Sequence, residues 1–309
     1  MRAPNHVKRA GIPGSWKDGE VITERLPPVF SSSALLSQWR LDPRALALGT
    51  LAATVYVIGL RRVSRGGSPF PRSRPVAFFS ALAVTLLALA SPIDAYADVL
   101  FSVHMVQHLL LMLVAPPLFA LGAPITLALR AARPQTGRRY LRRILNSRAL
   151  ALLSHPVVAW SVFVGVSFAT HFTPLYERAL ESQAVHTLEH AIMLGAGLLF
   201  WWPVVGLDPS PHRMSHPLRL LYLALAMPAG AFLGVAIFSA SQPLYAHYAS
   251  LPPPWGAAAL ADQRYAGAYM WVFGNLALLV AVLFEAVAWK RSDDERQRRL
   301  ERHLDAVAD

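Results

Sequence analysis

The stretch HMVQHLLLMLVAPPLFALGAP, residues 104–124, decides the fold class of this chain. It contains no Asp, Glu, Lys or Arg, and a long apolar run of this kind is typical of a helix inside a lipid bilayer. Pro116 and Pro117 cannot donate the backbone hydrogen bonds of a regular helix, so we expect them to kink the helix or end its regular part. The stretch therefore predicts a transmembrane helix over about residues 99–121.

Similar apolar stretches lie on both sides of it. The chain has 309 residues, of which 54% are hydrophobic and only 15% charged, so its length is used mostly for membrane spans and not for soluble domains. Asp42-Pro43 is a typical helix start and opens the first stretch. We predict an all-α polytopic membrane protein with seven transmembrane helices, at about 42–60, 75–91, 99–121, 154–171, 185–205, 217–239 and 266–289.

The remaining segments complete the predicted organisation. Residues 1–41 contain Pro, Ser and mixed charge without a long apolar run, which predicts a disordered tail before a transmembrane domain over 42–289. Residues 290–309 are predicted to be a charged cytoplasmic tail with a short helix. Arginines alternate with Leu and Ile over 138–153, which predicts one interfacial amphipathic helix. Trp201 and Trp202 are interpreted as part of an aromatic belt, and Gly195 and Gly197 as points of close helix packing.

The distribution of Lys and Arg predicts the orientation. Alternate loops are strongly basic, with five such residues in 61–74, seven in 130–148, two in 206–219 and six in 290–309. The loops between them carry none or one. By the positive-inside rule, the N-terminus lies outside and the C-terminus in the cytoplasm. The net charge of +11 is explained by this topology, so we do not predict nucleic-acid binding.

Histidines gather on the predicted outer side. His104 with His108, and His186 with His190, have the i,i+4 spacing that places two side chains on one helix face. His171 ends the fourth predicted span. Imidazole is costly in lipid without a partner, and transition metals are its commonest partners in proteins. The sequence therefore predicts a metal site formed by His104, His108, His171, His186 and His190.

Other residues on that side are candidate accessory groups. Met112 and Met193 continue the two histidine stripes, and Met270 can enter the same cavity. Glu189 and Asp262 are placed to orient imidazole rings as acceptors. His247 lies in the last outer loop. The accessory set is Met112, Met193, Asp262, Met270, His247 and Glu189.

The chemistry of the ligands limits the metal. The chain has no cysteine, which excludes disulfides and thiolate sites, so a metal must use His, Met or carboxylate ligands. Histidine with thioether ligands suits Cu(I), whereas histidine alone suits Cu(II) or zinc. An i,i+4 histidine pair can also be a packing or hydrogen-bonding pair, methionines are often core filler, and spacing does not show whether the two pairs face each other.

Four strings resemble the CtaG family of cytochrome c oxidase assembly factors. They are HMVQHLLLMLVAPPLFALGAP (104–124), THFTPLYERALESQAVHTLEHAIMLGAGLLFWWPVVGLDP (170–209), AMPAGAFLGVAIFSASQPLYAHYA (226–249) and DQRYAGAYMW (262–271). The resemblance implies a seven-span protein of the bacterial cell membrane that is needed for oxidase assembly and is commonly linked to copper insertion. By position, the histidines of the family correspond to the five named above, and its acidic site before the last span to Asp262.

We therefore expect an assembly factor, not an enzyme, that binds copper through outer-leaflet histidines and passes it to cytochrome c oxidase subunits. A copper-donating protein and the lipid bilayer are its other expected partners. Three alternatives stay open: a haem-binding membrane cytochrome, a metal or proton transporter, and a scaffold whose histidines only hydrogen-bond helices together.

Overall fold

The computed structural model describes residues 42–308 except 68, 133–136 and 252–257, together with 27–28, 33 and 37–39. Every regular element in this part of the chain is a helix, which confirms the predicted all-α fold class. Six helical stretches are long and apolar enough to cross a membrane, and α11 (Pro156–Phe172) with α12 (Leu175–Glu181), bent by 65°, is a seventh candidate. These stretches correspond to the seven predicted spans. The prediction for the tail 1–41 lies almost wholly outside the described residues.

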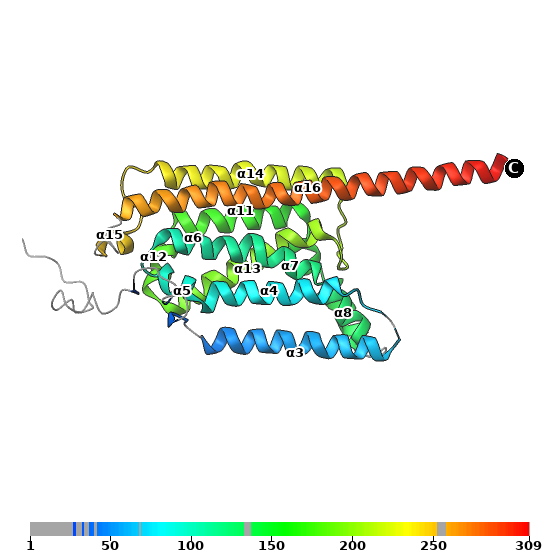
Figure 1. Ribbon diagram of the computed structural model, residues 1–309, viewed down its shortest axis with the longest axis horizontal. Helices are drawn as coiled ribbons and strands as arrows, with labels where there is room; N and C mark the ends of the chain where they lie inside the picture. The colour runs from blue at the N-terminus through cyan, green and yellow to red at the C-terminus, as the bar shows by residue number, and fades with distance from the viewer. Residues whose placement is uncertain are drawn as a thin grey trace, which may run out of the picture.

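The long helices lie side by side in one bundle, with α3 at its edge (Figure 1). They are α3 (Pro43–Arg65), α4 (Ser73–Ala90), α11, α13 (Gln183–Val205), α14 (His216–Ser239) and α16 (Ala259–Ala308). The short helices α5 (Pro92–Ala97), α12 and α15 (Ala246–Ser250) gather at one end, which we call the α15 end. Helix α8 (Pro124–Ala131) lies at the opposite end, the α8 end, where α16 runs on beyond the bundle.

Large apolar side chains face outward along the bundle. Leu51 and Val55 on α3, Phe232 on α14 and Phe284 on α16 are all exposed, although they lie in apolar helices long enough to cross a membrane. A water-soluble protein rarely exposes apolar surface on this scale, whereas a bilayer covers it. The outer surface therefore fits the membrane setting that the composition predicts.

The third predicted span is broken in the middle. It consists of α6 (Phe101–Leu109), a π-helical turn η1 (Leu110–Val114) and α7 (Ala115–Leu121). Pro116 has no N–H to donate to the carbonyl of Met112 four residues earlier. Trp201 Nε1 donates to that carbonyl instead, at 3.1 Å. The prediction that the two prolines disturb the helix is confirmed, but the assignment of Trp201 to an aromatic belt is wrong because its side chain is buried in this contact.

Helix α13 packs very closely against this break. A Cβ atom added to Gly197 would lie 2.6 Å from Pro116 Cγ and 2.8 Å from the Met112 carbonyl oxygen, so only glycine fits there. A Cβ at Gly195 would meet no atom within 4 Å. The prediction of close helix packing thus holds for Gly197 and is wrong for Gly195. The contact at Gly197 sets how near α13 approaches the span that contains α6.

Two further predictions differ from the structure. The amphipathic segment 138–153 is not one helix but two, α9 (Gly137–Leu145) and α10 (Arg148–Leu153). They are separated at Ser147, whose hydroxyl accepts a hydrogen bond from the Leu150 amide and begins the second helix. The charged segment after residue 289 is not a separate short helix, because it continues the last span as the end of α16.

Candidate metal centre

Five histidines from three helices meet near the α15 end of the bundle. Helical spacing puts His104 and His108 on one face of α6, and His186 and His190 on one face of α13. His171 occupies the last turn of α11. All five side chains are buried. The structure brings together the five histidines predicted from the sequence.

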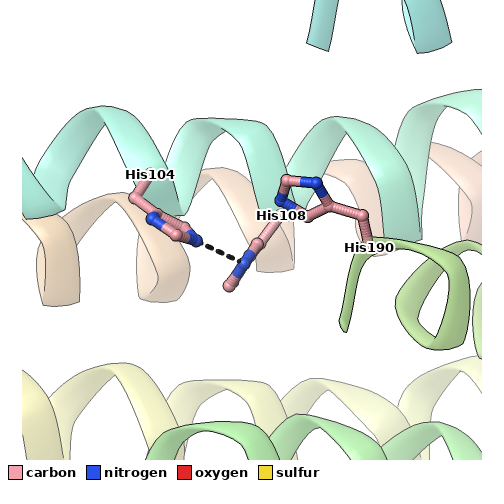
Figure 2. A group of neighbouring side chains, drawn as sticks. All are labelled: His104, His108 and His190. Atoms are coloured by element: carbon pink, nitrogen blue, oxygen red, sulfur yellow. Dashed lines mark hydrogen bonds between the residues drawn. The ribbon is translucent and has the colours of Figure 1, made fainter. Parts of the chain in front are cut away.

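The histidine pairs on α6 and α13 face each other. The candidate ligand atoms of His104, His108 and His190 all lie within 4.8 Å of one another (Figure 2). His104 Nε2 and His108 Nε2 are 2.9 Å apart. His104 also belongs to a second group of the same size limit, with His186 and Glu189. The two groups share one imidazole, so they form a single continuous cluster, which we call the histidine cluster.

Several polar atoms in the histidine cluster have no hydrogen-bond partner. Among the described residues these are Nδ1 of His108, Nε2 of His186, Nε2 of His190 and both carboxylate oxygens of Glu189. Glu189 Oε1 comes only within 3.9 Å of His108 Nε2. A buried polar atom without a partner costs about 1–3 kcal/mol, and more when it is charged. Such a concentration of unpaired nitrogen and oxygen donors is what a cation-binding site requires, so these residues fit a metal ion.

A tyrosine from another element holds His104 in place. The Tyr248 hydroxyl, on α15, lies 3.2 Å from His104 Nδ1 and donates to the carbonyl of Ala97 at 2.8 Å. Burial raises the pKa of this hydroxyl well above its ordinary value, so it stays neutral at physiological pH. Because the hydroxyl donates to the Ala97 carbonyl, it accepts from His104 Nδ1–H. Nε2 of that ring, the atom 2.9 Å from His108 Nε2, then carries no proton and has a lone pair for an ion. The sequence offered no sign of this contact, because Tyr248 lies far along the chain in a separate short helix.

His171 reaches the cluster from the side and contacts a methionine. Its ring centroid lies 5.5 Å from that of His108, and its Nε2 atom lies 3.2 Å from the sulfur of Met105. Met105 follows His104 directly and so does not lie on the His104–His108 face of α6. For that reason the helical spacing of the sequence points to Met112 and gives no sign of Met105.

The three accessory methionines lie beside the cluster. Met112 and Met193 are buried in the apolar core with Phe200 and Trp201, on the side of the histidines that faces the α8 end. Met112 and Met270 also line a cavity of about 60 Å³ that has His108 and His171 on its wall. Met112 and Met270 therefore have access to the same space as two of the histidines.

The other accessory residues hold helices in place. Asp262 on α16 accepts from the backbone amide of Ser102, at 3.2 Å, and from its hydroxyl, so it anchors the start of α6. His247 contacts the carbonyl of Asp98 through Nε2 at 2.9 Å, and its amide donates to Glu177. Glu189 is the accessory residue that lies inside the histidine cluster.

Comparison with known proteins places the chain in a family. A family model described as cytochrome c oxidase caa3 assembly factor (Caa3_CtaG) matches residues 54–292, which include all five histidines. The chain is also 33% identical over 288 residues to uncharacterized proteins of Mycobacterium bovis and Mycobacterium tuberculosis, covering 91% of this chain and 44% of each relative. An uncharacterized protein of Mycobacterium leprae is 33% identical over 276 residues, covering 87% of this chain and 42% of the relative.

The chain spans less than half the length of these curated relatives. No solved structure matches it. The family match covers more than half of the chain and takes in every helix that contributes to the histidine cluster. The chain belongs to the family of cytochrome c oxidase caa3 assembly factors.

Proposed function

We propose that this protein binds a copper ion in the histidine cluster and passes it to a subunit of cytochrome c oxidase during assembly. The family membership supports the assembly role. The observation that carries the metal proposal is the set of buried nitrogen and oxygen atoms on His108, His186, Glu189 and His190 that find no partner within the described part of the chain. A bound cation is the partner that these atoms lack.

Copper follows from the ligands and from the role of the family. Imidazole nitrogens bind copper, zinc, iron and nickel ions, and the chain has no cysteine to offer. Oxidase assembly by this family is commonly linked to copper insertion, which selects copper from that group. His104, His108, His186 and His190 would be the main ligands, with His171 or a methionine completing the site. Handing over an ion needs exchangeable ligands and no bond-making step, so we propose a copper chaperone and not an enzyme.

The membrane orientation is part of the proposal. Helix α8, which is followed in the chain by the arginine-rich helices α9 and α10, lies at the end of the bundle opposite to the histidine cluster. The positive-inside rule then puts the histidine cluster at the outer face of the bacterial cell membrane, where a copper-donating protein can reach it. The cysteine-free chain allows a direct test. Ser241→Cys near the α15 end should react in whole cells with a membrane-impermeant maleimide, and Ser292→Cys on the end of α16 should react only after lysis; the reverse pattern contradicts the orientation.

Two alternatives are disfavoured by the surroundings of the cluster. The ring centroids of the cluster lie 4.2 to 6.1 Å apart, and the neighbouring cavity is only about 60 Å³, so the described residues leave no gap of porphyrin size beside the histidines. On the side of the cluster that faces the α8 end, the chain forms an apolar core that includes Phe163, Met193, Phe200 and Leu223. A transporter needs polar groups through the full thickness of the membrane, and this core does not provide them.

The test is the metal content and visible spectrum of the purified protein. Wild type is compared with His104→Ala/His108→Ala and with His186→Ala/His190→Ala. A matched control is His155→Ala/His212→Ala, which removes a neighbouring histidine pair with ring centroids 4.9 Å apart, outside the histidine cluster. We expect near-stoichiometric copper in wild type and in the control, and its loss in both cluster variants.

Each other result has a defined meaning. A haem absorption band would show that the protein binds haem, and it would overturn the copper proposal. Failure of well-folded wild-type protein to bind either Cu(I) or Cu(II) would remove the copper proposal and leave the assembly role to the family membership alone. Metal lost equally from the control would show non-specific binding to surface imidazoles.

A further inference from the structure

The contact between His171 and Met105 differs in kind from the histidine cluster. Nε2 of His171 and the sulfur of Met105 are 3.2 Å apart, and both side chains are buried. The contact joins α11 to α6 at the edge of the histidine cluster, with one imidazole nitrogen facing one thioether sulfur.

The hydrogen bonds of His171 determine which of its nitrogens carries the proton. Nδ1 lies 2.7 Å from the backbone carbonyl of Ser167, which can only accept, so Nδ1 donates. In a neutral ring the proton is then on Nδ1, and Nε2 has a free lone pair. That lone pair faces a thioether sulfur, which has no proton to give. Two electron-pair donors therefore face each other in a buried place.

This arrangement fits a metal ligand pair. Metal-binding histidines usually donate their other ring N–H to a backbone carbonyl or carboxylate, as His171 does with Ser167. Nitrogen and sulfur ligands lie about 2.0 to 2.3 Å from a bound ion, so two donors at this separation can contact the same ion. A thioether is a soft ligand and favours Cu(I) over Cu(II) or zinc.

A cavity lies beside the His171 side of this contact. His171 and His108 lie on the wall of the same cavity of about 60 Å³, together with Met112 and Met270. The sulfur of Met112 lies 4.0 Å from the hydroxyl of Ser167, on the turn of α11 that precedes His171. His108 of the histidine cluster and His171 of the contact thus line the same cavity.

We propose that His171 and Met105 form a second, thioether-containing subsite that selects a soft monovalent ion, Cu(I), beside the histidine cluster. The proposal rests on the proposed metal-binding function of the bundle, and it assigns different ions to the two sites. The histidine cluster accepts divalent or monovalent ions, and the subsite retains the monovalent one. Met112 and Met270 line the adjoining cavity, to which α11, α14 and α16 also contribute residues.

Silver(I) is the probe, because it is a soft monovalent ion that does not change oxidation state. Detergent-purified wild type, Met105→Leu and Met214→Leu are loaded with silver(I), and X-ray absorption at the silver edge reports its ligands. Leu matches the volume of Met, and Met214 is a buried methionine of the apolar core and outside the subsite, so it is a matched control. We expect a sulfur shell in wild type and Met214→Leu, and a nitrogen-only shell with about 10- to 100-fold weaker silver binding in Met105→Leu. Zinc binding should be unchanged.

Two outcomes overturn the subsite alone. One is a nitrogen-only shell in wild type, and the other is a sulfur shell that persists in Met105→Leu. A second measurement needs no substitution: selenomethionine-labelled wild type must show a silver–selenium shell, and its absence also overturns the subsite. Failure of wild type to bind silver, copper and zinc is a different result, because it removes the proposed function together with this inference.

Discussion

Two buried glutamates on different helices have opposite surroundings. Glu285 on α16 accepts from His216 Nδ1 at 2.6 Å and lies 3.6 Å from Arg219 Nη1. Glu189 on α13 is just as buried, yet neither of its carboxylate oxygens has a hydrogen-bond partner among the described residues. Glu285 is satisfied by the fold. Glu189 is left without a partner, in the cluster where α6 and α13 also bring unpaired imidazole nitrogens together among the described residues.

The difference teaches how to separate a structural polar group from a candidate ligand in this bundle. A buried carboxylate is stable when neighbouring residues neutralise and hydrogen-bond it. Asp208, between α13 and α14, follows the same rule as Glu285, because it accepts from the amides of Ile125 and Thr126 at 3.1 and 2.6 Å. The buried carboxylate of Glu189 in the histidine cluster has no such neighbour among the described residues, and a bound ion is the partner that we propose for it.

The largest expected effect tests the open carboxylate. Glu189→Gln keeps the shape of the side chain but removes its charge, so metal affinity should fall by about 10- to 100-fold. Stability should stay the same or rise, because a buried carboxylate without a partner is costly. Copper titration and the thermal midpoint of the detergent-solubilised protein measure the two quantities. A large loss of stability with unchanged copper affinity would make Glu189 a structural residue like Glu285.

The reverse result is expected for the satisfied carboxylate. Glu285→Ala leaves His216 and Arg219 without their acceptor, which should destabilise the protein by about 2 kcal/mol while copper affinity stays unchanged. Glu295→Ala on the exposed part of the same helix is the control. Its pair with Arg299 is exposed, and such pairs contribute only about 0–1 kcal/mol. Equal thermal midpoints for the two variants would contradict the structural role of Glu285.

A third prediction concerns the packing that brings the two histidine pairs together. Gly197→Ala places a methyl group against Pro116 and the Met112 carbonyl, which should cost about 1–3 kcal/mol and weaken copper binding by moving α13 away from α6. Gly195→Ala is the matched control two residues earlier. It has open space, so it should be neutral or slightly stabilising. Identical melting curves and copper titrations for the two variants would show that the close approach is unimportant.

The smallest expected effect concerns Tyr248. Tyr248→Phe removes the hydroxyl beside His104 Nδ1 and should weaken copper binding about tenfold, since groups that orient a ligand commonly have effects of this size. Tyr245→Phe is the control: its hydroxyl donates to the carbonyl of His171 and not to a ring nitrogen. Copper competition titrations of both variants would decide. Equal affinities in the two would mean that Tyr248 does not orient the ring.

Much of the fold follows from local patterns in the sequence. Apolar runs of membrane length predicted all of the long helices, and the spacing of HMVQH and HTLEH predicted which histidines share a helix face. Predictions that depended on the surroundings of a residue were less successful. Trp201 was assigned to the membrane interface, whereas it is buried against Met112. Gly195 and Gly197 have the same neighbours in sequence, yet one faces open space and the other a proline ring.

By itself, the sequence determined the fold class, the long apolar helices and the five histidines, because hydropathy and helical periodicity act over neighbouring residues. Only the tertiary structure decided that the pairs on α6 and α13 face each other, that Met105 contacts His171, and that Glu189 has no hydrogen-bond partner among the described residues. These facts depend on how α6, α11 and α13 pack and rotate against one another. The spacing of residues within one helix carries no information on that relation.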